Sequence, residues 1–172
     1  MEQLDKALEN LKAAILSRPP KKQQLLVDWL NKWSRLLQSE DTFMPSSLPY
    51  YKRGDIIYAD FGFNVGAEYG GVHYAVVMEV DNNKANRNIL VVPLTSNTSG
   101  QPVSRNDVFL GNDVITWKEA GTVAKPNQIR AISKMRILKP VKAGDRLARL
   151  SGAQLQLIDN KLKEFLRLGL DK

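Results

Sequence analysis

The sequence predicts a mainly β protein of the α+β class: a small β-barrel with a C-terminal helix, preceded by a pair of helices. Three observations support this prediction. Residues 50–140 alternate short apolar runs with turns rich in Gly, Pro and Asn, which is typical of a small barrel. Residues 1–37 carry Leu and Trp at helical spacing, and a similar stripe follows Ser151. We therefore expect a helical extension and linker over residues 1–49 and a barrel domain over residues 50–172.

The extension begins with an amphipathic helix. Its apolar stripe consists of Leu4, Leu8, Leu11 and Ile15. This spacing of three and four residues places all four side chains on one helical face. Pro19 and Pro20 end this helix, because Pro has no backbone N–H to continue the hydrogen-bond ladder.

A second amphipathic stretch follows, with a broader stripe that includes two tryptophans. The stripe consists of Leu25, Leu26, Trp29, Leu30, Trp33, Leu36 and Leu37. We expect it to be buried, either within the chain or on a partner, and packing within the chain is favoured. Ser39–Pro49 contains several Pro and Ser residues and is predicted to be a linker.

The middle of the chain is predicted to hold the strands. Asp55–Phe61, His73–Val80 and Ile89–Thr95 are the three clearest, and a polar turn over residues 81–88 separates the last two. The continuous apolar run of the third strand indicates burial on both faces. Shorter strands are expected at Val108–Phe109, Thr122–Ala124 and Arg130–Ile132.

The C-terminal helix is predicted to begin after Ser151, which is a suitable N-cap. Its apolar stripe consists of Leu155, Ile158, Leu162, Phe165 and Leu166. Gly169 is expected to end it.

Composition narrows the function. The chain of 172 residues has no Cys, which excludes disulfides, a thiol nucleophile and thiolate metal ligands. No apolar run approaches the roughly 20 residues of a membrane span, and the start of the chain lacks an apolar signal core, so a cytoplasmic protein is expected. No nucleotide-binding loop or zinc-ligand spacing occurs, so no metal and no cofactor are expected.

The net charge of +7 lies mainly in residues 50–150, with 14 Lys and Arg against 9 Asp and Glu. This excess of positive charge favours polyanionic partners.

His73 is the single histidine of the chain and the leading catalytic candidate. It follows the glycine-rich turn of residues 66–71 and opens an apolar strand. Such a turn can bring an imidazole close to a phosphate, and imidazole titrates near neutral pH.

Several segments, in order and at matching spacing, resemble the MazF/PemK family of toxin endoribonucleases. They are Lys52–Phe61, Gly66–Val72, Ala75–Met78, Val92–Ser96 and Asn127–Ile132. The resemblance covers roughly residues 50–170. It implies an SH3-like barrel that cleaves single-stranded RNA at selected sequences without metal, leaving 2′,3′-cyclic phosphate and 5′-hydroxyl ends. It also implies a homodimer and a cognate antitoxin protein.

The resemblance implies roles for individual residues. Thr95 matches a family Ser/Thr that contacts the scissile phosphate, and Glu68 matches an acidic residue expected to assist His73. RNA-binding residues are expected to be Arg53, Ser96, Lys125, Asn127, Gln128 and Arg130. Tyr69 and Trp117 are candidate base-stacking platforms, although packing is the favoured role for each.

The chain departs from the family pattern at two places. The family usually has Gly-Gly-x-Arg-Pro with a catalytic Arg, where this chain has His73-Tyr74, and an acidic residue where this chain has Asn127. Histidine suits proton transfer better than arginine, which stays protonated. We therefore favour an active enzyme. The alternatives are a CcdB-like toxin that binds gyrase, a non-catalytic RNA- or protein-binding relative, and an interaction protein that docks through Trp29 and Trp33.

Overall fold

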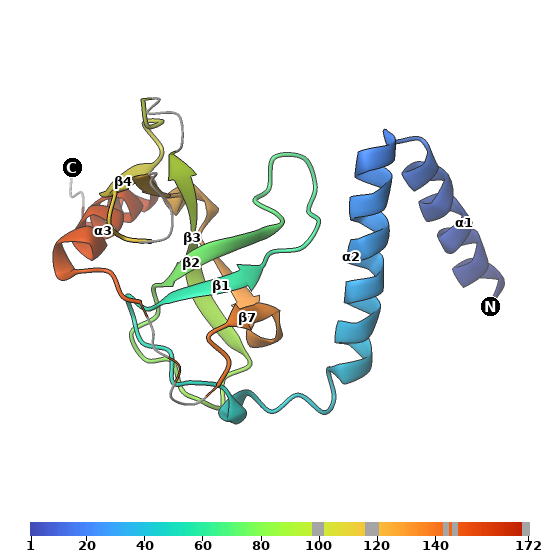
Figure 1. The fold of residues 1–172 in the computed structure, drawn as a ribbon, viewed down its shortest axis with the longest axis horizontal. Coiled ribbons are helices and arrows are strands. Elements are labelled where there is room, and N and C mark those ends of the chain that lie inside the picture. Colours follow the sequence, from blue (N-terminus) through green and yellow to red (C-terminus); the bar gives the residue numbers. More distant parts are fainter. Residues whose placement is uncertain (98–101, 116–120, 143–144, 146–147, 170–172) are drawn as a thin grey trace. The chain divides into compact units, whose positions relative to one another are not determined.

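The fold was analysed in a computed structural model, which describes residues 1–97, 102–115, 121–142, 145 and 148–169. The chain forms two compact units, Met1–Phe43 and Met44–Lys172. The first holds helices α1 (Glu2–Leu16) and α2 (Pro20–Ser39). The second holds the strands and helix α3 (Gly152–Leu166) (Figure 1). The described helices are too short or too polar to cross a membrane.

The two predicted N-terminal helices are confirmed, and the Pro pair separates them. Pro20 is the first residue of α2, where its missing N–H costs nothing because that donor has no helical partner. Gln23 closes the turn between the helices, since its side-chain amide donates to the carbonyl oxygens of Leu16 (3.1 Å) and Arg18 (2.7 Å).

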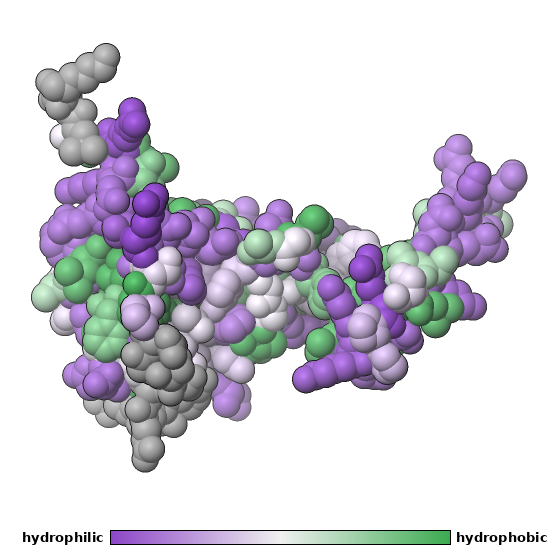
Figure 2. Space-filling model, turned by 90° about the horizontal axis from the view of Figure 1, so that it is seen from above, coloured by the Kyte–Doolittle hydropathy of each residue, from purple (hydrophilic) through white to green (hydrophobic). Residues whose placement is uncertain are grey.

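The helical pair does not bury its apolar stripes by itself, and the expected burial of the second stripe, on the barrel domain or on a partner, stays a prediction. Ile15 is the one buried residue of α1, and α2 has none. Trp33 and Leu37 expose 47% and 50% of their surface. Figure 2 shows apolar side chains, in green, on the surface of this unit at the right of the view. Two short helices bury one seam between them and leave the rest of a broad stripe outside.

The second unit is built on one antiparallel sheet, and the described residues contribute seven strands. They are β1 (Ile56–Asp60), β2 (Val72–Val77), β3 (Asn88–Asn97), β4 (Val108–Gly111), β5 (Gly121–Ala124), β6 (Arg130–Ser133) and β7 (Ile137–Lys139). Their order is β4-β5-β3-β2-β1-β7, with β6 paired to β3. The predicted mainly β barrel with a C-terminal helix is confirmed.

Both faces of this sheet are covered. On one face Val76, Val92 and Leu94 pack in a core that includes Ile158 of α3. On the other face the intervening residues, such as Val91, are equally buried. This explains the continuous apolar run of β3, since a strand buried on both faces need not alternate. The exception is Leu90, which remains 36% exposed.

Strand β2 ends at Val77 and not at Val80 as predicted. The carboxylate of Glu79 accepts hydrogen bonds from the Leu90 backbone N–H (3.4 Å) and the Asn82 side chain (2.6 Å). A side chain thus takes the place of the next backbone partner, and the ladder stops. The short strand β7 was not predicted, because three residues show no periodicity.

Helix α3 begins as predicted, with a capping box between Ser151 and Gln154. Its end differs from the prediction. Arg167 adopts the left-handed conformation (φ 52°) and ends the helix two residues before Gly169.

An ion pair between the buried Asp55 carboxylate and the half-exposed Arg149 side chain fastens the segment before α3 to the start of β1. Asp55 is 1% exposed. One carboxylate oxygen accepts from the Lys52 backbone N–H (2.7 Å), and the other accepts from Nε (2.8 Å) and Nη2 (2.6 Å) of Arg149.

We expect Asp55→Ala to lower the free energy of unfolding by about 1–3 kcal/mol, because it leaves the Lys52 backbone N–H and the half-exposed Arg149 guanidinium without their acceptor. Urea unfolding of the full chain measures this. The matched control is Glu164→Ala, which removes the exposed pair with Lys161 and should cost less than about 1 kcal/mol. Equal losses for the two variants would contradict a structural role for Asp55.

Candidate functional site

The glycine-rich loop before β2 is held in one conformation by its own hydrogen bonds. The Phe61 N–H donates to the Gly71 carbonyl (2.8 Å), and the Gly71 N–H donates to the Gly62 carbonyl (2.7 Å). The Asn64 side chain donates to the carbonyl oxygens of Tyr69 (2.7 Å) and Phe61 (3.1 Å). Tyr69 therefore leaves the loop from a fixed backbone position.

Tyr69 packs against His73. Their ring centroids lie 4.5 Å apart, and the Tyr69 hydroxyl is 3.1 Å from Nδ1 of His73 and 3.3 Å from the Leu94 carbonyl oxygen. The ring of Phe61 meets that of Tyr69 edge to face, with centroids 5.9 Å apart. These contacts orient the imidazole from the loop side.

Thr95 joins the same place from strand β3. In the antiparallel register of β2 and β3, Tyr74 lies opposite Leu94. His73 precedes Tyr74 and Thr95 follows Leu94, so the next position of that register brings His73 beside Thr95. The Thr95 side chain forms a hydrogen bond with the Tyr69 phenol, which also contacts His73, so Tyr69 links these two sequence-predicted residues.

The pKa of the Tyr69 phenol is raised. Burial is the main cause, a hydrogen bond with the Thr95 side chain lowers the pKa in part, and the negative charge of Asp107 raises it. Tyr69 therefore keeps its hydroxyl proton at neutral pH and can act as a hydrogen-bond donor there.

Gln128 and Arg130 complete the group. The Gln128 side-chain oxygen accepts from the Tyr69 backbone N–H (3.2 Å) and from Nη2 of Arg130 (3.0 Å). The Arg130 guanidinium also lies over the Phe61 ring, 5.9 Å from its centroid. We call Tyr69, His73, Thr95, Gln128 and Arg130 the His73 cluster. It combines an imidazole, two hydroxyls and a cation, which are groups able to move a proton and stabilise a phosphate.

Two of the expected RNA-binding cations are engaged in ion pairs. Arg53 is paired with Asp159 of α3 and donates to the Met78 carbonyl oxygen. Lys125 lies 2.6 Å from a carboxylate oxygen of Asp107. Both therefore hold parts of the barrel together in this structure.

Three further expected residues lie away from the imidazole. Glu68 and Asn127 are exposed, and within the described part of the chain the Glu68 carboxylate has no hydrogen bond or ion pair. Ser96 pairs with Thr122 and leaves β3 on the face opposite to Thr95. Their predicted roles remain predictions. Trp117 lies outside the described residues.

The sequence did not single out Tyr69 as a partner of His73, although it offered one signal. Tyr69 stands four residues before His73, across two consecutive glycines. A tight turn there returns the chain toward its start, but the sequence alone does not say which side chain points back.

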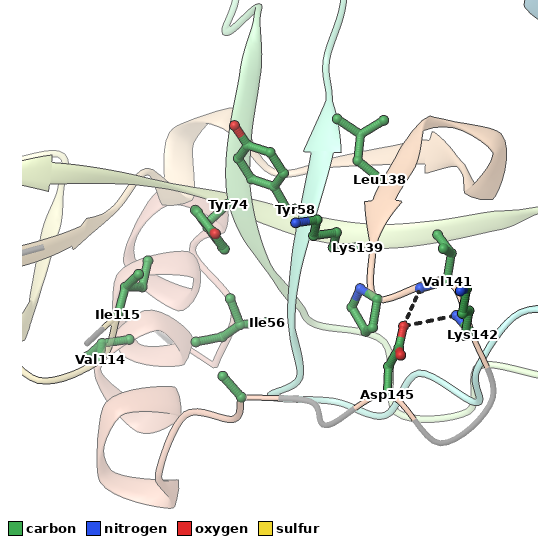
Figure 3. A pocket seen from close by; sticks show the side chains of 12 residues that line it. Ile56, Tyr58, Tyr74, Val114, Ile115, Leu138, Lys139, Val141, Lys142 and Asp145 are labelled. Carbon is green, nitrogen blue, oxygen red and sulfur yellow. Dashed lines mark hydrogen bonds between the residues drawn. The ribbon is translucent and has the colours of Figure 1, made fainter. Parts of the chain in front are cut away.

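A separate apolar pocket of about 620 Å³ lies on the other face of the sheet (Figure 3). Tyr58 and Tyr74 stack at its wall, with ring centroids 4.6 Å apart. The Asp145 carboxylate at the rim accepts from the backbone N–H groups of Val141 (3.1 Å) and Lys142 (3.0 Å). Because Tyr74 directly follows His73 on β2, the two side chains leave opposite faces, so this pocket is distinct from the His73 cluster.

No group of three or more His, Cys, Asp or Glu side chains suited to holding a metal ion occurs in the described ranges. The His73 cluster itself offers one imidazole and no carboxylate.

Comparison with known proteins identifies the family. Residues 52–166 match the model of the PemK-like, MazF-like toxin of type II toxin–antitoxin systems. The chain belongs to this toxin family. The match includes all of the His73 cluster and excludes the helical pair.

A solved structure with a TM-score above 0.5 agrees with this fold, and two others match with lower scores. The chain is similar to MazF (Form-I) from Deinococcus radiodurans, with 22% identity and a TM-score of 0.52, over 69% of this chain and 99% of that one. The MazE-MazF (Form-II) structure from the same organism matches with 20% identity and a TM-score of 0.47, over 70% of this chain and 99% of the other. Mycobacterium tuberculosis toxin MazF-mt6 matches with 13% identity and a TM-score of 0.47, over 66% and 97%. A search of curated proteins finds no match.

We expect Gln128→Leu to lower the free energy of unfolding by about 1–3 kcal/mol, because it leaves two half-buried donors without their acceptor. Chemical unfolding measures the loss. The neighbouring exposed residue supplies the control, since Asn127→Ala should change stability by no more than about 0.5 kcal/mol. A neutral Gln128→Leu variant would mean that Tyr69 is not held through Gln128.

Proposed function

We propose that this toxin is a metal-independent endoribonuclease that cleaves single-stranded RNA at selected sequences. The 2′-hydroxyl attacks the adjacent phosphorus, the bond from phosphorus to the 5′-oxygen breaks, and a 2′,3′-cyclic phosphate and a 5′-hydroxyl remain. The observation that carries the proposal is the position of His73. It lies against the Tyr69 hydroxyl (3.1 Å), beside Thr95, in a member of a toxin family.

Each step of this reaction has a candidate group in the His73 cluster. The attacking 2′-hydroxyl must lose a proton, and an imidazole is a suitable base near neutral pH. The phosphorane gains negative charge, which the Thr95 hydroxyl and the Arg130 guanidinium stabilise by hydrogen bonding and charge. The leaving 5′-oxygen takes up one proton, either from the imidazolium that the first step creates or from water. Glu68 is proposed to assist His73 from the exposed loop.

The charge of the barrel favours a polyanionic substrate. Residues 50–150 carry 14 Lys and Arg against 9 Asp and Glu. Such a surface attracts RNA through its phosphates and releases counterions on binding. We propose Arg53, Ser96, Lys125, Asn127, Gln128 and Arg130 as residues that contact RNA.

We further propose that the protein is a cytoplasmic homodimer and that a cognate antitoxin protein binds it. The family to which the chain belongs is described as the toxin of a type II toxin–antitoxin system. The solved MazE-MazF structure contains such a pair for Deinococcus radiodurans.

The first test is incubation of end-labelled single-stranded RNA with the full chain in excess EDTA. We expect discrete cuts that end in cyclic phosphate. His73→Ala should reduce the rate by about 10²–10⁴-fold, the range of a general acid–base group, while its unfolding curve stays cooperative. Unchanged cleavage by this variant would refute the assignment of His73. No cleavage by the wild type across varied RNAs would refute the ribonuclease and make gyrase inhibition the next assay.

The variant His73→Arg tests whether the side chain at this position acts by proton transfer or by its positive charge. Arginine keeps a positive charge at the position but offers no base at neutral pH. We expect the rate of this variant to stay below about a tenth of the wild-type rate. A variant as active as the wild type would show that the position acts through charge alone.

A pair of glycine variants tests whether RNA approaches His73 from the loop. Gly71 and Gly66 both have positive φ (81° and 60°), so Ala at either should cost about 1 kcal/mol of stability. The Cβ at position 71 would lie 3.7 Å from Nε2 of His73, whereas the Cβ at position 66 meets nothing within 4 Å. Gly71→Ala should therefore lower RNA cleavage about tenfold or more relative to Gly66→Ala. Equal rates for the two variants would show that substrate does not reach this side of the imidazole.

A further inference from the structure

We propose that Tyr69 is a positioning residue that holds His73 as its Nδ1–H tautomer and so makes Nε2 the basic nitrogen of the ring. The tautomer is inferred from the contacts of the Tyr69 hydroxyl. Its consequence for catalysis rests on the proposed ribonuclease function.

The Tyr69 hydroxyl has a single proton, and its neighbours determine which of them receives it. A phenol has one proton to donate and can accept as well. Its oxygen has three neighbours. It lies 3.3 Å from the Leu94 carbonyl oxygen and 3.1 Å from Nδ1 of His73, and it forms a hydrogen bond with the Thr95 side chain that lowers the Tyr69 pKa, as a donor to the phenol oxygen does. A carbonyl oxygen can only accept, so the contact with Leu94 is a hydrogen bond only if Tyr69 donates its proton there. The hydroxyl then accepts at its contact with His73, and the proton between Tyr69 and His73 belongs to Nδ1.

The opposite arrangement satisfies one contact fewer. If Tyr69 donated to Nδ1, its oxygen would face the Leu94 carbonyl oxygen at 3.3 Å with no proton between them. Two acceptors that face each other in a half-buried place repel, and the hydrogen bond with the Thr95 side chain is available in both arrangements, so it does not offset the lost contact with Leu94. The Nδ1–H tautomer therefore agrees with both measured distances.

The backbone and the ring of Tyr69 are held by three contacts, so its hydroxyl keeps one position relative to the imidazole. The Tyr69 backbone N–H is bound to Gln128 (3.2 Å), and its carbonyl accepts from Asn64 (2.7 Å). Phe61 holds the ring by an edge-to-face contact. A residue held in this way can orient a catalytic imidazole in the manner of a second hydrogen-bonding group behind a base.

The basic nitrogen then faces the glycine turn. A Cβ on Gly71 would lie 3.7 Å from Nε2, so Nε2 is on the side of the ring turned toward residues 70 and 71. In the proposed reaction, Nε2 takes the proton of the 2′-hydroxyl and the ring becomes an imidazolium. The extra charge is stabilised by the Tyr69 oxygen, which accepts from Nδ1–H throughout.

The single histidine of this chain makes the tautomer directly measurable. In a two-bond ¹H–¹⁵N correlation spectrum of the ¹⁵N-labelled full chain, the imidazole signals come from His73 alone. Recorded at a pH where the ring is neutral, the spectrum should show a protonated Nδ1 and an unprotonated Nε2. A wild-type spectrum dominated by the Nε2–H tautomer would overturn the proposal, whatever the variants do.

Tyr69→Phe removes the hydroxyl and keeps the ring. We expect the spectrum of this variant to shift toward the Nε2–H tautomer that histidine prefers in water. Tyr58→Phe is the matched control, because it removes a phenolic hydroxyl on the other face of the same sheet and should leave the tautomer unchanged. A folded Tyr69→Phe variant that keeps the Nδ1–H tautomer would refute the positioning role.

Activity provides a separate measurement. If the wild type cleaves RNA, Tyr69→Phe should lower kcat about 10–100-fold with KM changed less than about threefold, because the residue orients the base and does not bind substrate. An unchanged kcat would refute the catalytic consequence. If the wild type cleaves no RNA, the proposed function fails, while the tautomer is still decided by the spectrum.

Discussion

The central position of strand β3 is the constraint on which the barrel and the site both depend. β3 pairs with β2 on one edge and with β5 and β6 on the other. Its residues Val91, Val92 and Leu94 are buried on alternating faces. A slip of one residue would turn every side chain of a strand to the opposite face, so burial on both faces fixes the register. That register places His73 of β2 beside Thr95, and the candidate site is thus a consequence of packing in the core.

The same alternation separates two environments on one strand. His73 faces the loop and Thr95, whereas Tyr74 faces the apolar pocket beside Tyr58. Polar groups that could serve phosphate chemistry gather on the first face, and aromatic and aliphatic groups gather on the second. The sheet keeps them apart, so the His73 cluster can be altered with little effect on the pocket. This separation is why a substitution at Tyr58 is a suitable control for one at Tyr69.

The proposed role of Tyr69 would explain the departure from the family pattern. Where the family usually has arginine, a residue that stays charged, this chain has a histidine whose use as a base depends on which nitrogen holds the proton. An isolated imidazole exchanges between two tautomers, so a base at this position needs a partner that selects one. Tyr69 is placed to do this by a loop that its own backbone hydrogen bonds hold in shape. In the proposed arrangement, a histidine at position 73 and the hydroxyl of Tyr69 beside it act together.

The sequence by itself determined the class of the fold, the helices and most strands, because apolar periodicity reflects which faces are buried. It also indicated His73 as the single histidine beside a glycine-rich turn, and its resemblance to the toxin family indicated Thr95. Only the tertiary structure decided what those residues touch. It brought Tyr69 rather than Glu68 to the imidazole, and it engaged Arg53 and Lys125 in ion pairs. A sequence records which side chains are available along the chain. Contacts between a loop, two strands and a helix depend on which distant segments pack together, and long-range packing in the core determines that.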